Sequence, residues 1–341
     1  MDLNGAIPTC PAGATMQATL ERILNRQALD QREAEQLMAA MLSDETPEPL
    51  VAATLASLRT RGETAAELAG FTRALLRLAL PCRAPQPCID TCGTGGDGAG
   101  TFNISTATAL LCAAQGLNVV KHGNRSVTSK SGSADVMEAL GIAFAAPGSV
   151  ARSRFVFLFA PGYHPALKRL APLRRQLGVR TVFNLIGPLA NPARPPMQLV
   201  GVATQEKLAP VAEALRLLGT QRAFVVHGEP GLDEATPVAP FTLIDVKHDG
   251  LTQMVMDAAD FGLDACRLED LRGGTAAENA AMIEALFSGE KGPRRDVIVL
   301  NAALVFLMTG VAGQPRDAAG LAQRVLDSGA ALALLRELRR G

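Results

Sequence analysis

The chain has 341 residues, of which 48% are hydrophobic and 19% are charged, so its length and composition indicate one large or two medium globular domains. Its 33 basic residues balance 33 acidic ones, which argues against a broad basic surface for nucleic acid but leaves room for a local anion site. The opening stretch MDLNGAIPTCPAGATM lacks the pattern of a signal peptide, and the longest apolar run, residues 297–312, is shorter than the ~20 residues of a membrane helix. We therefore expect no membrane partner, and a buried core helix at residues 297–312.

The cysteines indicate a reduced compartment. Six cysteines are scattered along the chain, and Cys82, Cys88 and Cys92 lack the CxxC spacing of a zinc site. Cysteines scattered in this way are usually small buried residues that stay reduced in the cytosol. We expect a cytoplasmic protein without a disulfide framework or a cysteine metal cluster.

The first eighty residues predict a series of helices. Residues 30–33 (DQRE) and 64–67 (TAAE) have the spacing of a capping box, and each precedes an apolar stretch with helical periodicity. Pro47 after a threonine predicts another helix start, and Gly62 a helix end. The prolines at positions 81–87 then predict a boundary.

Beyond this boundary, short apolar runs alternate with helical segments. Predicted strands lie at CID (88–90), NVVKHGN (118–124), FVFLFAP (155–161), MQLVGVAT (197–204) and RAFVVHG (222–228). Such alternation favours a mainly parallel sheet flanked by helices, an α/β fold.

The segment HPALKRLAPLRRQLG (164–178) predicts another helix, kinked at Pro172, that rejoins the N-terminal helices. We therefore expect two domains: residues 1–82 with about 165–195 form a smaller all-helical domain, and residues 83–164 and 196–341 form the α/β domain.

A glycine-rich segment, GTGGDGAGTFNIST (93–106), follows the first predicted strand. Gly93, Gly95 and Gly98 satisfy G-x-G-x-x-G, but a dinucleotide site needs an acidic residue after the next strand. Lys121 and Arg125 occupy that region, which argues against a nicotinamide site. No Gly-Lys-Ser/Thr follows the loop, so a Walker motif is absent as well.

The glycine segment is typical of an anion site because bare backbone N–H groups precede a predicted helix start at Ser105 and Thr106. A second polar loop, KHGNRSVTSKSGSAD (121–135), follows the neighbouring strand. In a parallel sheet both loops emerge at the same edge, which favours a ligand with more than one phosphate. The alternative is a flexible turn at the first loop and a solvated one at the second.

Two adjacent carboxylates, Asp233 and Glu234, follow the predicted strand RAFVV in the loop HGEPGLDEATP. Carboxylates beside a phosphate site are typical ligands of Mg²⁺. The alternative interpretation is a solvated acidic turn.

Several ordered blocks resemble the anthranilate phosphoribosyltransferase family of tryptophan biosynthesis. The blocks are SLRTRGETAAELAGF, GTGGDGAGTFNIST, KHGNRSVTSKSGSAD, YHPALKRLAPLRRQLGVRTVFNLIGPLANP, GLDE and LRGGTAAENAAMIEALFSGEKGPRRDVIVLNAA. The resemblance covers the chain from about Met16 onward. One departure is the segment before Phe155, which is shorter than usual in the family, so we expect a trimmed helix there, away from the catalytic loops.

The resemblance implies transfer of a phosphoribosyl group from phosphoribosyl pyrophosphate (PRPP) to the amine of anthranilate. It implies a nucleoside phosphorylase/phosphoribosyltransferase-like fold, Mg²⁺ as cofactor and a homodimer formed through the helical domain. A pyrimidine nucleoside phosphorylase-like enzyme and a non-catalytic nucleic-acid-binding relative are the alternatives.

The PRPP site that the resemblance implies is made of residues from both polar loops. These residues are Gly93, Gly96, Asp97, Thr101, Asn103, Ile104, Ser105, Thr106, Lys121, His122, Gly123, Asn124, Arg125, Ser126, Val127, Thr128, Ser129 and Ser133.

The other roles also come from the resemblance. It implies that Ser105, Asp233 and Glu234 bind the metal, that Gly93, Asn124 and Arg174 bind anthranilate, and that His122 and Pro188 lie in blocks lining its path. Arg175 is the other candidate for the arginine that faces the site. Lys121 and Asn124 would act electrostatically, and no residue is expected to be a general base.

Overall fold

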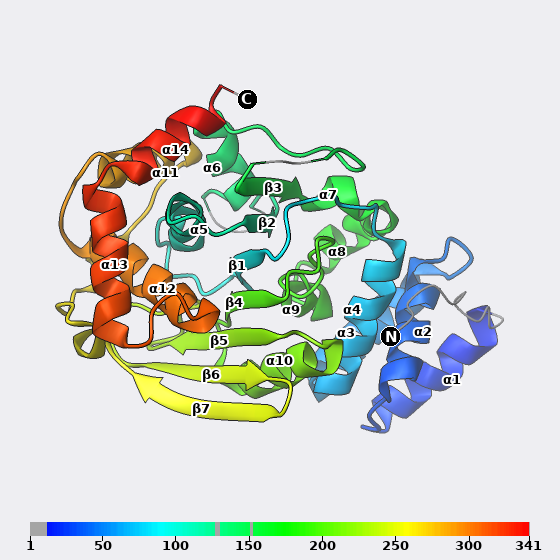
Figure 1. Cartoon of the computed structure of the whole chain (residues 1–341). Coiled ribbons are helices and arrows are strands. Elements are labelled where there is room, and N and C mark those ends of the chain that lie inside the picture. The colour runs from blue at the N-terminus through cyan, green and yellow to red at the C-terminus, as the bar shows by residue number, and fades with distance from the viewer. Residues whose placement is uncertain (1–11, 127–129, 151–152, 341) are drawn as a thin grey trace.

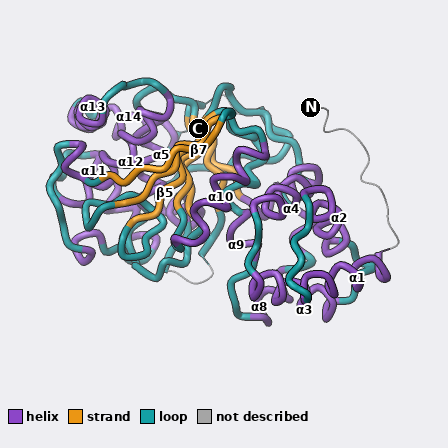
Figure 2. Tube along the Cα trace, turned by 90° about the horizontal axis from the view of Figure 1, so that it is seen from below, coloured by secondary structure: helices purple, strands orange, loops and turns teal. Residues whose placement is uncertain are grey.

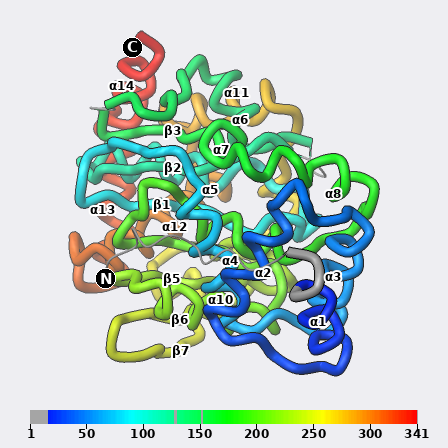
Figure 3. Tube along the Cα trace, turned by 90° about the vertical axis from the view of Figure 1, so that its right-hand side faces the viewer, coloured from blue at the N-terminus to red at the C-terminus, as the bar shows by residue number. Residues whose placement is uncertain are grey.

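A computed structural model describes residues 12–126, 130–150 and 153–340, which form one seven-stranded sheet with helices around it (Figure 1). The strand order is β3-β2-β1-β4-β5-β6-β7, and Figure 3 shows the strands stacked from β3 at the top to β7 at the bottom. The strands from β3 to β5 in this order are parallel. Their bounds are β1 Ile89–Gly93, β2 Val119–Gly123, β3 Phe155–Phe159, β4 Met197–Gly201, β5 Arg222–Gly228, β6 Phe241–Lys247 and β7 Gly250–Met256.

Two large hydrophobic cores cover the opposite faces of the sheet. Alternating strand residues divide between them, so that Leu199 of β4 packs in one core and its neighbour Val200 in the other. Covered faces explain why the parallel strands are apolar along most of their length. The first core contains α5 (Ile104–Ala114), α6 (Ser133–Ala139), α11 (Ala276–Phe287), α12 (Pro293–Thr309), α13 (Pro315–Asp327) and α14 (Ala330–Leu338).

The second core joins the sheet to the N-terminal helices through α10 (Gln205–Leu218). Figure 2 shows α1–α4 gathered with α8 and α9 on one side of the molecule. The N-terminal helices are α1 Ala12–Leu24, α2 Gln31–Leu42, α3 Glu48–Arg61 and α4 Ala65–Leu78. Together these features confirm the predicted α/β fold with an additional helical part.

The predicted helix starts are confirmed by their caps. In α2 the Glu33 N–H donates to Asp30 over 2.8 Å while the Asp30 N–H donates to the Glu33 carboxylate, and Thr64 and Glu67 form the same box at α4. Pro47 precedes α3, and Gly62 ends it with φ of 92°, a backbone conformation that favours glycine.

The segment after β3 packs on the N-terminal helices, with Leu170 and Val182 in their core. The predicted single kinked helix is wrong, because the segment forms separate pieces: α7 (Ala160–Tyr163), a 3₁₀ turn (Pro165–Lys168), α8 (Ala171–Leu177) and α9 (Val182–Ile186). Pro172 lies in the first turn of α8, where a proline fits because that position needs no N–H hydrogen bond.

The antiparallel hairpin of β6 and β7 was not predicted from the sequence. Its turn is His248–Asp249, between the paired residues Lys247 and Gly250. β7 is exposed along most of its length, so it lacks the apolar run by which β1 to β5 were recognised. The Asp-Gly pair at 249–250 was the available signal, since such pairs are typical of hairpin turns.

Two further expectations concern helices. The run at residues 297–312 lies in the buried helix α12, as predicted, and in the described part of the chain no helix is both long and apolar enough to cross a membrane. The trimmed helix expected before Phe155 is wrong for the described residues 143–150 and 153–154, which are not helical. There the Ala145 N–H pairs with the Phe157 carbonyl and Phe144 stacks on Phe159, so the segment lies along β3 instead.

A buried carboxylate ties β1 to the chain that returns from the helical part. Asn191 donates from Nδ2 to Asp90 Oδ2 and to the Val120 carbonyl, both over 2.8 Å. Burial raises the pKa of Asp90 to about 6, although Lys121 and these hydrogen bonds favour the charged form. At neutral pH, the ionised Asp90 carboxylate therefore makes an unfavourable contribution to the free energy of folding.

This cost predicts a pH effect on stability for Asp90→Asn. Because the pKa is higher in the folded than in the unfolded chain, the contribution of Asp90 to the free energy of unfolding falls as pH rises from about 4 to about 6. Asparagine carries no charge, so the variant's stability relative to the parent should increase over this range by up to about 3 kcal/mol. Urea unfolding at several pH values measures the difference, and a pH-independent difference would contradict the assignment.

Candidate active site

The site lies where four parallel strands end in glycine, at Gly93, Gly123, Gly201 and Gly228. A methyl group on Gly201 would lie 1.5 Å from the Asp233 carbonyl oxygen, and one on Gly93 would lie 2.2 Å from Asp233 Oδ2. A methyl group on Gly228 would lie 2.4 Å from the Glu234 carbonyl oxygen. The strand ends at Gly93, Gly201 and Gly228 therefore lack side chains because the acidic loop lies directly against their backbone.

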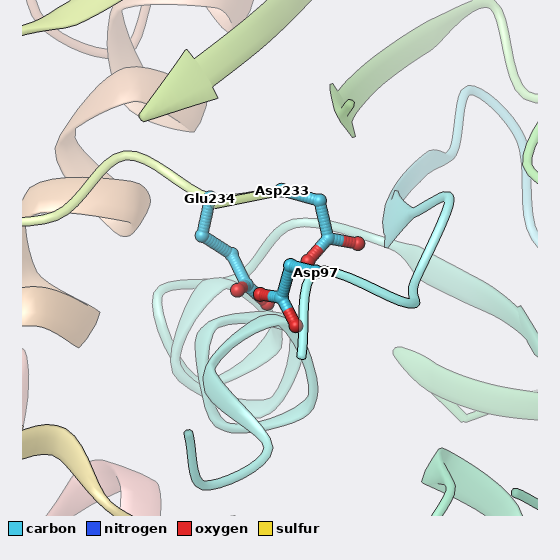
Figure 4. A group of neighbouring side chains, drawn as sticks. All are labelled: Asp97, Asp233 and Glu234. Carbon is cyan, nitrogen blue, oxygen red and sulfur yellow. The ribbon is translucent and has the colours of Figure 1, made fainter. Parts of the chain in front are cut away.

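Three carboxylates meet above these strand ends. Asp97 reaches from the loop after β1 toward Asp233 and Glu234 (Figure 4), and carboxylate oxygens of the three residues lie within 4.8 Å of one another. The Gly95 N–H donates to Asp233 over 2.6 Å, and Asn301 of α12 donates to the Ala235 carbonyl over 2.7 Å. These bonds hold the acidic loop between the glycine loop and α12.

The electrostatics of this cluster favour a cation. Burial raises the pKa of Asp233 to about 7, and the charge of Asp97 adds to the shift. Burial and the charges of Asp233 and Asp97 raise the pKa of Glu234 well above its usual range. Lys121 and the Ser105 N–H act in the opposite direction. Clustered carboxylate oxygens are the ligands of a hard divalent cation such as Mg²⁺, so the donor set fits this ion. Asp97, predicted only as a PRPP contact, lies with the predicted metal ligands.

The glycine loop has a backbone that few other residues adopt. Gly95, Gly96, Gly98 and Gly100 have φ of 64°, 73°, 72° and 65°. Its far end is fixed by the segment 271–274: the Phe102 N–H donates to the Leu271 carbonyl, and Thr101 forms a β-bridge with Arg272.

The start of α5 follows this loop. Asn103 caps the helix without a side-chain hydrogen bond to its backbone, and Ser105 and Thr106 lie in the first turn, with Ile104 buried between cap and serine. Among the described residues the buried Thr106 hydroxyl has no hydrogen-bond partner. The first turn of a helix carries partial positive charge, which is the physical basis of the prediction that this position binds an anion.

Asn279 is a supporting residue that the sequence reasoning missed. Its Nδ2 donates over 2.8 Å both to Asn103 Oδ1 and to the Ser131 hydroxyl, and its Oδ1 accepts from the Gly274 N–H. It therefore ties the start of α5 to the second polar loop. No local sequence pattern indicated this contact, because Asn103 and Asn279 lie 176 residues apart.

Lys121 lies beneath the two loops and is 2% exposed. Its Nζ donates to the Thr91 carbonyl over 2.5 Å and lies 3.4 Å from the Ser105 hydroxyl. In the described part of the chain it forms no ion pair, so its charge acts at a distance on Asp90 and Glu234.

The second loop closes on itself through Asp135. This carboxylate accepts from the backbone N–H groups of Ser126 and Gly132, and Gly123 makes room for Ser133, whose Oγ would lie 2.2 Å from an added methyl group. The Asn124 carbonyl accepts from the Ala134 N–H. The predicted residues Val127, Thr128 and Ser129 lie outside the described residues.

Two predicted side chains of this loop have other partners. The Arg125 guanidinium pairs with Asp135 and Glu138 on α6. Burial, with smaller effects of His164 and Lys121, lowers the pKa of His122 to about 3, so its imidazole is neutral at neutral pH. A neutral histidine adds no positive charge for phosphate.

The paired arginines of α8 differ in burial. Arg174 is half-buried with its guanidinium 4.9 Å from the centre of the Phe183 ring, whereas Arg175 is exposed. Burial lowers the pKa of Arg174. Within the described residues its guanidinium has no hydrogen bond or ion pair, so the side-chain donors are available to a ligand.

A cavity of about 300 Å³ lies elsewhere, at the opposite ends of the strands, beside Pro196 and Gln221. Arg73, Arg77 and Arg194 line it together with leucines and prolines, and none of its lining residues is acidic. The cavity therefore has no carboxylate to bind a cation, and the carboxylate cluster is the better candidate for the active site.

Comparison with known proteins identifies the class of protein. The chain matches a glycosyl transferase family, helical bundle domain, at residues 17–79, and a glycosyl transferase family, a/b domain, at residues 85–332. Fold and site thus define a glycosyl transferase with a helical bundle and an α/β domain.

Closer relatives specify the family. The anthranilate phosphoribosyltransferase of Moorella thermoacetica is 44% identical over 329 residues, which cover 95% of this chain and 97% of that protein. The crystal structure of the Thermus thermophilus enzyme has a TM-score of 0.87 at 40% identity, covering 94% of this chain and 99% of that one. The structure of the Saccharomyces cerevisiae enzyme in complex with PRPP and Mg has a TM-score of 0.87 at 28% identity, covering 96% of this chain and 97% of that one. The chain belongs to the anthranilate phosphoribosyltransferase family.

The close packing at Gly201 predicts that Gly201→Ala displaces the acidic loop, because the added methyl group would overlap the Asp233 carbonyl. We expect a loss of about 1–3 kcal/mol in unfolding free energy from overpacking, and weaker binding of Mn²⁺ followed by electron paramagnetic resonance. Gly250→Ala is the matched control, since no atom lies within 4 Å of its added methyl group. Equal Mn²⁺ affinity in both variants would contradict the assignment.

Proposed function

We propose that this chain transfers the phosphoribosyl group of PRPP to the amine of anthranilate, releasing pyrophosphate and forming N-(5-phosphoribosyl)anthranilate in tryptophan synthesis. The observation that carries the proposal is the carboxylate cluster of Asp97, Asp233 and Glu234 beside the glycine loop and the start of α5. A cation-binding group next to an anion-binding loop suits a metal-bound diphosphate.

The cofactor of the proposed reaction is Mg²⁺, held by Asp97, Asp233 and Glu234 with Ser105 beside them. When bound, it neutralises negative charge on the diphosphate oxygens. The raised pKa values of Asp233 and Glu234 mean that cation binding has to displace protons, so the site binds its metal better at higher pH.

The chemistry needs electrostatics more than proton transfer. The bond between the anomeric carbon and the diphosphate oxygen breaks with its electron pair leaving on the diphosphate, and the amine nitrogen forms the new bond and then loses a proton to solvent. Backbone N–H groups of the glycine loop, the first turn of α5 and the buried charge of Lys121 are fixed in position to stabilise the leaving diphosphate. The aromatic amine is neutral at pH 7, which explains why no general base is needed.

The acceptor is proposed to bind through Arg174. Its half-buried guanidinium is free of protein carboxylates in the described part of the chain and is held against Phe183. A planar fork of donors suits the carboxylate of anthranilate. Gly93 and Asn124 are proposed as the other contacts, and the remaining residues implied by the family resemblance as PRPP contacts.

The organisation of the molecule supports domain closure. We propose that residues 1–82 move with about 165–195 against residues 83–164 and 196–341, because α8 and α9 pack in the core of the N-terminal helices. Closure would exclude water from the reacting sugar. A homodimer through the helical part is proposed from the family resemblance. The free thiols of the described residues suit a cytoplasmic location.

The proposal is tested with anthranilate, PRPP and Mg²⁺, by following the loss of anthranilate fluorescence. We expect a loss that requires both PRPP and the metal. Phosphorolysis of thymidine or uridine by the same sample is the control for a nucleoside phosphorylase. A stable anthranilate signal at every Mg²⁺ concentration would overturn the proposal, and a non-catalytic nucleic-acid-binding relative would give that result.

Arg174→Ala should weaken anthranilate binding by about 2–5 kcal/mol, because it removes one partner of a buried charge pair. The effect should appear in KM for anthranilate more than in KM for PRPP. Arg175→Ala is the matched control, since this neighbour is exposed and should leave both constants unchanged. Equal anthranilate constants for the two variants would show that Arg174 does not bind the acceptor.

A further inference from the structure

Arg180 connects the helical part of the molecule to the glycine loop. It lies between α8 and α9, and its Nη2 donates to the Thr94 carbonyl over 3.0 Å. Thr94 is the first residue after β1, and its own N–H donates to the Gly201 carbonyl. The guanidinium therefore meets the loop at the point where it leaves the sheet.

The same guanidinium fills the space above Gly96. A methyl group on Gly96 would lie 1.2 Å from Arg180 Nη1. Gly96 thus has two reasons to lack a side chain: its φ of 73° and the arginine that lies against it. This contact fixes the middle of the loop, whereas the segment 271–274 fixes its far end.

Hydrogen bonds fix the backbone at Arg180 and at the residue after it. Arg59 of α3 donates to the Arg180 carbonyl over 2.6 Å, and the next residue, Thr181, forms the capping box of α9 with Asn184. A side chain on a fixed backbone can place its donors accurately. In the described part of the chain the guanidinium has no carboxylate partner, so its positive charge is directed at the loop without being neutralised.

We propose that Arg180 is a positioning residue for the donor: from the helical part it holds the glycine loop in the shape that binds the diphosphate of PRPP. This inference rests on the proposed function and adds a residue to which neither the sequence motifs nor the family resemblance gave a role. The contact also makes the loop's shape depend on the position of the helical part, because Arg180 and Thr94 belong to different parts of the molecule.

The test measures each ligand separately in Arg180→Ala, Arg180→Lys and the control Arg175→Ala. Loss of a charge-assisted hydrogen bond should raise the Kd of Mg²⁺-bound PRPP, measured by calorimetry, roughly 10- to 100-fold. The Kd of anthranilate alone and the unfolding temperature should stay close to those of the parent. Arg180→Lys keeps a donor and a charge, so it should recover part of the PRPP affinity, and Arg175→Ala should match the parent.

A double-mutant comparison with Gly96→Ala tests the contact itself. The methyl group meets Arg180 in the parent chain but not in Arg180→Ala, so Gly96→Ala should weaken PRPP binding by a smaller factor in the second background. Equal factors in both backgrounds, or a PRPP affinity of Arg180→Ala within twofold of the parent, would overturn the role of Arg180. If the parent itself did not bind PRPP, the proposed function would fail instead.

Discussion

The site depends on the close approach of the acidic loop to strand ends that carry no side chain. Gly93, Gly201 and Gly228 let the backbone of Asp233 and Glu234 lie directly on the edge of the sheet. Burial at this edge raises the pKa values of both carboxylates, and Asp97 adds a third negative group. Burying three neighbouring carboxylates without a positive charge is unfavourable. A bound cation would compensate this unfavourable free energy, so the cluster is well suited to bind one.

The two parts of the molecule are coupled through buried groups and not only through a linker. One continuous core runs from the N-terminal helices through α10 to the sheet, and Asn191 joins the returning chain to Asp90 in β1. Arg180 makes a second connection, on the side of the glycine loop. Motion between the parts therefore has to exchange specific polar contacts, so ligand binding can favour one arrangement over another.

Local signals predicted much of this fold. The capping boxes, the alternation of short apolar runs with helices and the glycine loop before a helix each depend on residues close together in sequence, and each was found in the structure. The missed features depend on distant partners or weak patterns. No residue near Asn279 in the sequence indicates its contact with Asn103. The strand β7 has no apolar run to predict it, because its side chains are exposed. At Pro172 the sequence indicated a helix but not that the proline lies in its first turn.

Glu63 of the helical part pairs directly with Lys207 of α10, whereas the carboxylate cluster of the site has no such partner among the described residues. Asp97, Asp233 and Glu234 belong to the α/β part and have no ion-pair partner among the described residues, whereas Arg174 and Arg180 belong to the helical part and have no carboxylate partner there. The proposed reactants supply the missing charges, since a metal-bound diphosphate carries both signs and anthranilate carries a carboxylate. Electrostatic attraction to both reactants would then draw the two parts together around the reacting carbon. In the proposed reaction, such a closed site would arise only when both substrates are present, and it would protect the reactive sugar from water.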